Sequence, residues 1–395
     1  MSNVRVYFPN LNSIRFVAAL AVMIHHIELT KYWFGQPNIY TTSFVGGVFG
    51  QLGIILFFVL SGFLITYLLL AEQQATYTIS IKNFYIRRIL RIWPLYYFIV
   101  ILGLFILPHI KAMAIPGYTE EIHNHFLAKT LMFLSFIPDV AYAVYKHVPY
   151  AEQAWSVGVE EQFYVIWPLL IALVVRQKKT LGMLIGVIGF YTAIKIASII
   201  LNNRYEHNIA INDFYQFWQN FSIDCMAIGG IGAYLLFYKK DKVLKVLYNK
   251  YLQIALYLIV FVITIKGFAV PYFTYQIYSL IFVVLILNLA SNPKSVLNLE
   301  YKPLNYLGKI SYGLYMYHNI VLAACLKFLL YEGITLNSVW GNVLYYAVAI
   351  TVTVVIASLS YEYFEKWFIT AKVKYSKIVS GDNAITEEVP ESKTA

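Results

Sequence analysis

One apolar stretch near the start of the chain carries an arginine and a histidine at a spacing that suits chemistry inside a membrane. The stretch covers residues 11–27, and Arg15 and His26 are eleven positions apart within it. At about 100° per residue, eleven helical residues make three turns plus about 20°, so the two side chains share one face. The rise of about 1.5 Å per residue separates them by roughly 16 Å along the axis. A cation and an imidazole on one intramembrane face favour a functional role; snorkelling of Arg15 and hydrogen bonding of His26 to a neighbouring helix explain them equally well.

A second candidate site lies in residues 84–97, which read FYIRRILRIWPLYY. Arg88 and Arg91 are three positions apart, and are therefore neighbours on one face of a helix. The planar guanidinium fork suits phosphate, so the pair favours binding of a phosphorylated ligand. Anchoring of the helix by positive charge on the cytoplasmic side is the alternative, and it requires only charge.

Two further segments bring ionisable groups into apolar surroundings. Ser156 and Glu160 are four positions apart and share a helix face, while Glu161 lies on another face. Carboxyls that enter a membrane must be paired, protonated or in a wet cavity, so Glu160 either takes part in chemistry or holds a histidine or arginine of another helix. His318 lies nine residues past Lys309, about 13 Å along a helix, and is a second candidate for handling a proton. Hydrogen bonding between helices is the commoner role of such a histidine.

The elements that must position these groups follow from composition. Of the 395 residues, 60% are hydrophobic and 13% are charged, against about 25% charged in an average soluble protein. The sequence therefore predicts an all-α integral membrane protein with about ten transmembrane helices of roughly 20 residues each. A short apolar piece, 126–136, is expected to form a re-entrant or interfacial helix. The expected spans are 11–30, 50–71, 88–107, 157–175, 181–200, 214–237, 251–267, 272–290, 311–330 and 342–366.

The basic residues predict the orientation. Most of the 30 Lys and Arg fall in alternate connections, in clusters such as 87–91, 239–250 and 366–377. Because such clusters stay on the cytoplasmic side, we expect both the N- and C-termini in the cytoplasm. The first stretch is expected to remain as a permanent span, because no small-residue cleavage site follows it. Residues 1–376 would form one membrane domain, and the polar residues 377–395 a disordered cytoplasmic tail.

Several classes of function are disfavoured. The net charge of +10 resides in loops of a membrane protein, so it does not indicate nucleic acid. Cys225 and Cys325 lie inside apolar segments, which excludes a disulfide framework and a cysteine zinc site. The long outer connection holds His123, His125 and His147, whose spacing matches no standard ligand pattern, so no metal is expected. No internal repeat is evident, and the inverted symmetry common in transporters is therefore not indicated.

Six segments, taken in order, resemble the acyltransferase 3 family of membrane-bound O-acyltransferases. They are SIRFVAALAVMIHH (13–26), LGIILFFVLSGFLIT (52–66), FYIRRILRIWPLYY (84–97), AWSVGVEEQFYVIWPLL (154–170), LGKISYGLYMYHN (307–319) and SYEYFEKWF (360–368). Three motifs of the family fall on Arg15 with His26, on Arg88 with Arg91, and on Ser156 with Glu160.

The resemblance implies a multi-pass enzyme of the inner (plasma) membrane. It would transfer an acyl group from cytoplasmic acyl-CoA to a hydroxyl of a cell-surface or lipid-linked glycan, with membrane lipids as its surroundings. Acetyl-CoA is the default donor, and a succinyl or longer acyl group is left open. In a hypothesis that fits the spacing, Arg88, Arg91 and Arg15 hold the donor's phosphates and the pantetheine arm follows the first helix. His26 then acts as general base, with direct transfer preferred over an acyl-enzyme because no recognisable nucleophilic triad is present.

The chain departs from the family pattern in two segments. Asn12 and Ser13 stand where the family often has Asp-Gly, and Ile55 stands where it usually has an acidic residue. If that carboxylate assists catalysis in relatives, this chain does so otherwise or is less active. No hydrolase-like domain is expected after the last span. The alternatives are a transporter or exporter, in which the intramembrane groups line a path, and a membrane scaffold; acyl-CoA consumption distinguishes the enzyme from both.

Overall fold

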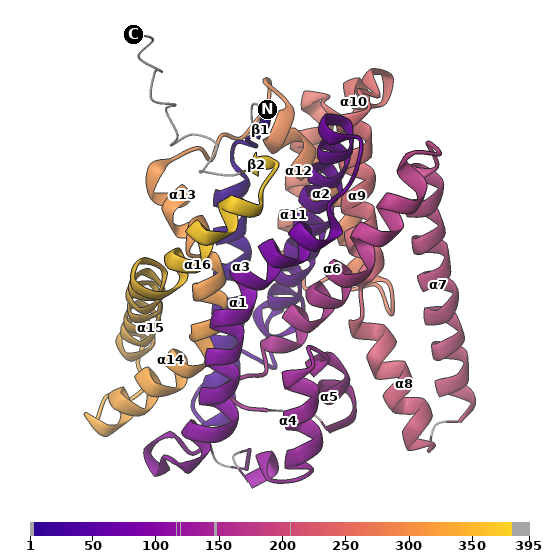
Figure 1. Cartoon of the computed structure of the whole chain (residues 1–395). Helices are drawn as coiled ribbons and strands as arrows, with labels where there is room; N and C mark the ends of the chain where they lie inside the picture. The colour runs from indigo at the N-terminus through magenta and orange to yellow at the C-terminus, as the bar shows by residue number, and fades with distance from the viewer. Residues whose placement is uncertain (1–3, 116, 119, 146–147, 206, 381–395) are drawn as a thin grey trace.

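The computed structural model is a bundle of membrane-length helices whose first and last described segments meet at one end of the bundle (Figure 1). It describes residues 4–115, 117–118, 120–145, 148–205 and 207–380. The helices of the first half are α1 (Leu11–Trp33), α2 (Gly50–Thr76), α3 (Ile81–Ile101), α4 (Phe126–Leu134), α5 (Pro138–Tyr145), α6 (Ala154–Val175) and α7 (Thr180–Arg204). Those of the second half are α8 (Ile209–Asn220), α9 (Ile223–Phe237), α10 (Asp241–Leu247), α11 (Lys250–Ile265), α12 (Thr274–Ser291), α13 (Lys302–Lys309), α14 (Ser311–Tyr331), α15 (Val339–Ser360) and α16 (Lys366–Ala371). Two short strands complete the fold, β1 (Val4–Val6) and β2 (Ile378–Ser380).

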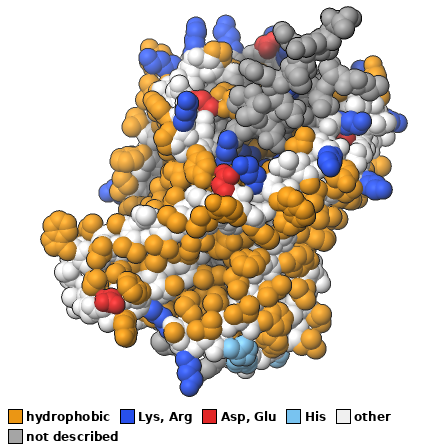
Figure 2. Space-filling model, turned by 60° about the vertical axis from the view of Figure 1, so that its left-hand side comes forward, with side chains coloured by type: hydrophobic (Ala, Val, Ile, Leu, Met, Phe, Trp, Pro, Cys, Tyr) orange, Lys and Arg blue, Asp and Glu red, His pale blue; other side chains and the backbone are white. Residues whose placement is uncertain are grey.

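The predicted number of membrane spans is confirmed. Among the described residues, nine helical runs are long and apolar enough to cross a membrane, and α10 with α11, bent by 54°, makes a tenth. The third run begins at Ile81 rather than at residue 88, because the helix continues past its apolar part through Lys82 and Arg87. On the face drawn in Figure 2, apolar side chains cover the middle of the molecule, and most of the visible Lys and Arg side chains lie toward the upper end.

Helices α2 and α9 pack very closely, because glycines at their contact let the two backbones approach each other. A Cβ atom at Gly62 would collide with the backbone of Met226, and one at Gly229 would collide with the backbone of Val59. In lipid, where apolar side chains gain little by leaving the solvent, close approach of backbones at small residues drives helix association. This contact fixes α2, which contributes one wall of the cavity described below.

The strand pair joins the start of the described chain to its end. β1 and β2 are parallel, with Val4 opposite Ile378 and Val6 opposite Ser380. The pairing puts both ends on one side of the bundle, as an even number of spans requires; the cytoplasmic location of that side stays a prediction. The sequence assigns residues 378–380 to a disordered tail, yet they form β2 because β1 supplies partners for their backbone groups. The rest of that tail, 381–395, lies outside the described residues.

Short helices cover the opposite end of the bundle (Figure 1). The predicted short helix of residues 126–136 is present as α4, and α5 follows it. Leu127 and Leu131, one turn apart on α4, are 71% and 54% exposed. An exposed apolar stripe on a short helix at the end of the bundle is typical of a helix that lies at a membrane interface.

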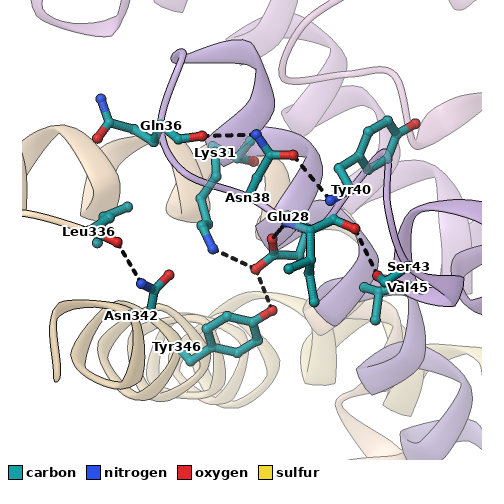
Figure 3. A network of polar contacts seen from close by, with 12 residues as sticks. Glu28, Lys31, Gln36, Asn38, Tyr40, Ser43, Val45, Leu336, Asn342 and Tyr346 are labelled. Carbon is teal, nitrogen blue, oxygen red and sulfur yellow. Dashed lines mark hydrogen bonds and ion pairs between the residues drawn. The ribbon is translucent and has the colours of Figure 1, made fainter. Parts of the chain in front are cut away.

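A buried ion pair within α1 accepts a hydrogen bond from α15 toward this opposite end. Lys31 Nζ lies 2.8 Å from Glu28 Oε1, and the Tyr346 hydroxyl donates to the same oxygen at 2.7 Å (Figure 3). The backbone N–H of Ile39 donates to the other carboxylate oxygen at 2.7 Å. Both oxygens of the buried Glu28 carboxylate therefore have hydrogen-bond partners. The connection after α1 is thereby held against α1 and α15.

Replacing Lys31 by methionine is expected to lower the melting temperature of the detergent-solubilised protein markedly. Removing one partner of a buried pair leaves an uncompensated charge and typically costs about 3–5 kcal/mol. Lys366→Met is the matched control, because it breaks the Lys366–Glu362 pair, which is of similar length at 2.7 Å but lies on the surface. Equal melting temperatures for the two variants would contradict a structural role for the buried pair.

Candidate active site

A cavity of about 220 Å³ opens at the strand end of the bundle between α1, α2, α3, α6 and α14. Most of the residues singled out by the sequence line it, namely Arg15, Arg88, Arg91, Ser156 and Glu160. The two histidines, His26 and His318, are not among its lining residues. The described lining also includes Lys309 and Lys372, so its cations greatly outnumber its one carboxylate, that of Glu160.

The arginines reach the cavity because α1 and α3 both begin at the strand end. The Arg88 guanidinium lies over the rings of Phe84 and Tyr164, 5.4 Å from each centroid. Its Nε–H is buried and has no hydrogen-bond partner among the described residues. Arg15 Nη1 donates to Asn12 Oδ1 at 2.9 Å. The aromatic faces hold the Arg88 cation in place while leaving a donor for an anion.

The neighbouring arginine has a structural task. Arg87 Nη2 pairs with Glu72 Oε2 at 3.1 Å, and Arg87 Nη1 donates to the Tyr375 carbonyl at 2.7 Å. These contacts join α3 to α2 and to the segment after α16. The sequence could not separate Arg87 from Arg88, because adjacent positions carry the same residue type.

Glu160 is held by hydroxyl groups rather than by a histidine or arginine. The Ser61 hydroxyl donates to Glu160 Oε1 at 2.8 Å, and the Tyr164 hydroxyl donates to Oε2 at 3.2 Å. Glu161 points to α3 instead, where Trp93 Nε1 donates to it at 3.0 Å. Sequence reasoning missed Ser61, because that serine belongs to another helix and carries no spacing signal toward Glu160.

The departures from the family pattern have different surroundings. Asn12 lines the cavity and orients Arg15, whereas the Ser13 hydroxyl donates to the Leu299 carbonyl at 2.7 Å. Ile55 is fully buried and is not among the lining residues, although its neighbour Ile54 is. A carboxylate in place of Ile55 would therefore not face this cavity in the present arrangement.

The inner end of the cavity is formed by a serine and a tyrosine. The hydroxyls of Ser156 and Tyr315 are 2.6 Å apart, and Tyr315 also donates to the Gln153 carbonyl at 3.2 Å. Gln153 Nε2 donates to the Met316 carbonyl at 2.6 Å, and Asn319 Nδ2 donates to Gln153 Oε1 at 2.8 Å. These hydrogen bonds hold the start of α6 against α14, and they fix Tyr315 where the two helices meet.

Beyond Tyr315, a row of rings continues away from the cavity. The His318 centroid lies 5.6 Å from Tyr315 and 4.7 Å from His26. His26 lies 5.0 Å from His25, whose ring lies 5.5 Å from Tyr40 in the connection after α1. The row therefore links the cavity at one end of the bundle to a connection near the other end.

The hydrogen bonds of the histidines determine which ring nitrogen is free to act. His26 Nδ1 lies 2.9 Å from the Val22 carbonyl, and His318 Nδ1 lies 2.5 Å from the Tyr315 carbonyl. A carbonyl only accepts, so in each neutral ring Nδ1 carries the proton and Nε2 keeps its lone pair. His318 Nε2 is buried and has no partner among the described residues. Both imidazoles are therefore in the tautomer that a general base acting through Nε2 requires.

Comparison with known proteins identifies the family of this chain. The sequence profile of the acyltransferase 3 family, described as an acyltransferase domain, matches residues 8–362. The chain is 25% identical to the peptidoglycan O-acetyltransferase OatA of Listeria monocytogenes over 378 residues, 91% of this chain and 56% of that protein. It is 26% identical to the O-acetyltransferase OatA of Staphylococcus aureus over 91% of this chain, and 27% identical to a putative O-acetyltransferase of the same species over 92%.

The chain spans 56–57% of the length of these relatives. No solved structure is a significant match to it. The profile match nevertheless extends over most of the chain and over the helices that form the cavity. The chain therefore belongs to the acyltransferase 3 family, and it is a multi-pass membrane protein.

Proposed function

We propose that this enzyme transfers an acyl group, acetyl by default, from acyl-CoA to a hydroxyl of a cell-surface or lipid-linked glycan. The observation that carries the proposal is the cation-lined cavity that ends at Tyr315 with His318 and His26 behind it. The names of the relatives support acetyl as the acyl group and a cell-wall glycan such as peptidoglycan as the acceptor.

The donor would enter at the strand end, which the basic residues predict to be cytoplasmic. Arg88, Arg91 and Arg15 line that part of the cavity and would bind its phosphate groups. A phosphorylated donor supplies the negative charge that the wall lacks. Its acyl end would then reach toward Ser156 and Tyr315, where the cavity ends.

The acceptor hydroxyl would approach the histidines from the other side of Tyr315. His26 Nε2 removes the hydroxyl proton as the oxygen attacks the thioester carbonyl. The new C–O bond forms, the C–S bond breaks, and the proton passes to the CoA sulfur. Tyr315 lines the cavity and contacts His318, which contacts His26, so the acyl carbonyl would lie where these three side chains meet.

The Tyr315 hydroxyl is the group best placed to stabilise the developing oxyanion. Tyr315→Phe is expected to lower kcat by about 10²–10³-fold, the usual cost of removing one oxyanion donor, with a small change in KM for the donor. Tyr317→Phe is the matched control. Tyr317 lies on the same helix as Tyr315 but does not line the cavity, and its hydroxyl donates to Ser360 of α15 at 3.0 Å. A kcat near that of the wild type in Tyr315→Phe would remove this role.

The proposed function is tested by release of free CoA. Purified protein in liposomes would receive acetyl-, succinyl- or longer acyl-CoA, with and without peptidoglycan fragments as acceptors. We expect CoA and O-acyl glycan to appear in equal amounts and to require the acceptor. Folded protein that neither binds nor consumes any acyl-CoA would refute the proposal.

A further inference from the structure

The segment that follows α16 is attached to the strand end of the molecule at two places. Its 3₁₀ turn, Lys372–Tyr375, receives a hydrogen bond from Arg87 Nη1 at the Tyr375 carbonyl, 2.7 Å away. A few residues later β2 pairs with β1. These attachments fix Lys372 beside α3, although it is distant in sequence from every other cation of the cavity.

Lys372 lines two hollows at once. One is the large cavity, and the other is a smaller hollow of about 50 Å³ between α2, α3 and this segment. Arg88 and Arg91 also line both hollows. The three cations therefore form a shared wall, with a long space on one side and a compact space on the other.

This wall carries more positive charge than the protein balances. Among the described residues, none of Arg88, Arg91 and Lys372 forms an ion pair with a carboxylate. The acidic residue of the smaller hollow, Glu72, already pairs with Arg87. The Arg88 Nε–H is in addition buried without a partner. Cations gathered away from bulk water with unfilled donors are costly unless an anionic ligand completes them.

We propose that Lys372 is a phosphate ligand of the donor site and that, with Arg88 and Arg91, it binds a phosphate group of acyl-CoA in the smaller hollow. This inference rests on the proposed function and adds a ligand from a part of the chain that no recognised motif covers. The phosphate is either that of the ribose ring or one of the diphosphate bridge.

The test compares Lys372→Gln with Lys374→Gln in the full chain. Lys374 lies two residues further, carries the same charge and is exposed outside both hollows. Calorimetry would give the Kd of CoA and of 3′-dephospho-CoA, and turnover would give KM for acetyl-CoA and kcat. We expect Lys372→Gln to raise Kd and KM by about 10-fold or more with little change in kcat, since a hydrogen bond to a charged group contributes about 1.5–3 kcal/mol. Lys374→Gln should match the wild type, and Lys372→Arg should retain most of the affinity.

The two CoA ligands distinguish the two phosphates. If Lys372 binds the ribose phosphate, the wild type prefers CoA over 3′-dephospho-CoA and Lys372→Gln loses that preference; if it binds the diphosphate, both ligands weaken equally. Unchanged Kd values in Lys372→Gln, with CoA binding to the wild type intact, would overturn the inference and leave the proposed function standing. A wild type that binds no CoA would refute the proposed function itself. If Lys372→Gln melts early, Lys372→Met, which keeps the aliphatic stem, takes its place in the same comparison.

Discussion

Replacing His26 by alanine is expected to lower kcat by about 10²–10⁴-fold, the range usually supplied by a general base. The imidazole is held in its helix by the Nδ1 bond to the Val22 carbonyl, and its Nε2 is the base in the proposed reaction. CoA affinity should stay unchanged, because His26 does not line the cavity. Single-turnover transfer to a glycan fragment, with CoA binding measured on the same preparation, checks both halves of the prediction.

His318→Ala is the comparison that assigns the base. His318 contacts His26 ring to ring at 4.7 Å, and as a neighbour of the base it should cause a smaller loss of kcat than His26. Melting temperatures of both variants would be recorded, since His318 is fully buried and its removal leaves a cavity. Activity retained in His26→Ala but lost in folded His318→Ala would move the role of base to His318.

Replacing Arg88 and Arg91 together by alanine is expected to raise the Kd for CoA by at least about 100-fold. Each lost contact between a guanidinium and a phosphate is worth about 1.5–3 kcal/mol, and both side chains line the two hollows of the donor end. At saturating donor the rate should fall much less than the affinity. Lys82→Ala is the control, because Lys82 is an exposed cation at the start of the same helix.

Ionic strength gives an independent check on the arginine pair. Donor binding by the wild type should weaken as salt rises, because screening reduces attraction between the phosphates and the half-buried cations. The double variant should lose much of this salt dependence. A double variant with the Kd of the wild type would show that the arginines only anchor the helix at the membrane surface.

Much of the bundle could be predicted because an apolar length of about 20 residues is a property of each segment alone. The helical repeat likewise predicted that Arg88 and Arg91 share a face, and the structure brings them to one cavity with Arg15 and Glu160. Helix ends were less accurate, as at Ile81, because a helix continues after its hydropathy falls.

What the sequence could not predict depends on which helix faces meet. The spacing from Arg15 to His26 gives a distance along one helix, but not that Tyr315 and His318 of α14 connect that histidine to the cavity. Ser61 and Lys372 were missed for the same reason. Each is an ordinary residue in its own segment and acquires a neighbour only through tertiary packing.

The pairing of β1 with β2 also sets an order of events during synthesis. Residues 4–6 emerge from the ribosome before the spans described above, yet their partners, 378–380, follow only after those spans have been made. The arginines of α3 are synthesised early, but Lys372, which lines the same cavity, is added only after α16. On the proposed reading, premature termination before residue 372 would leave a membrane-inserted protein with an unfinished donor site.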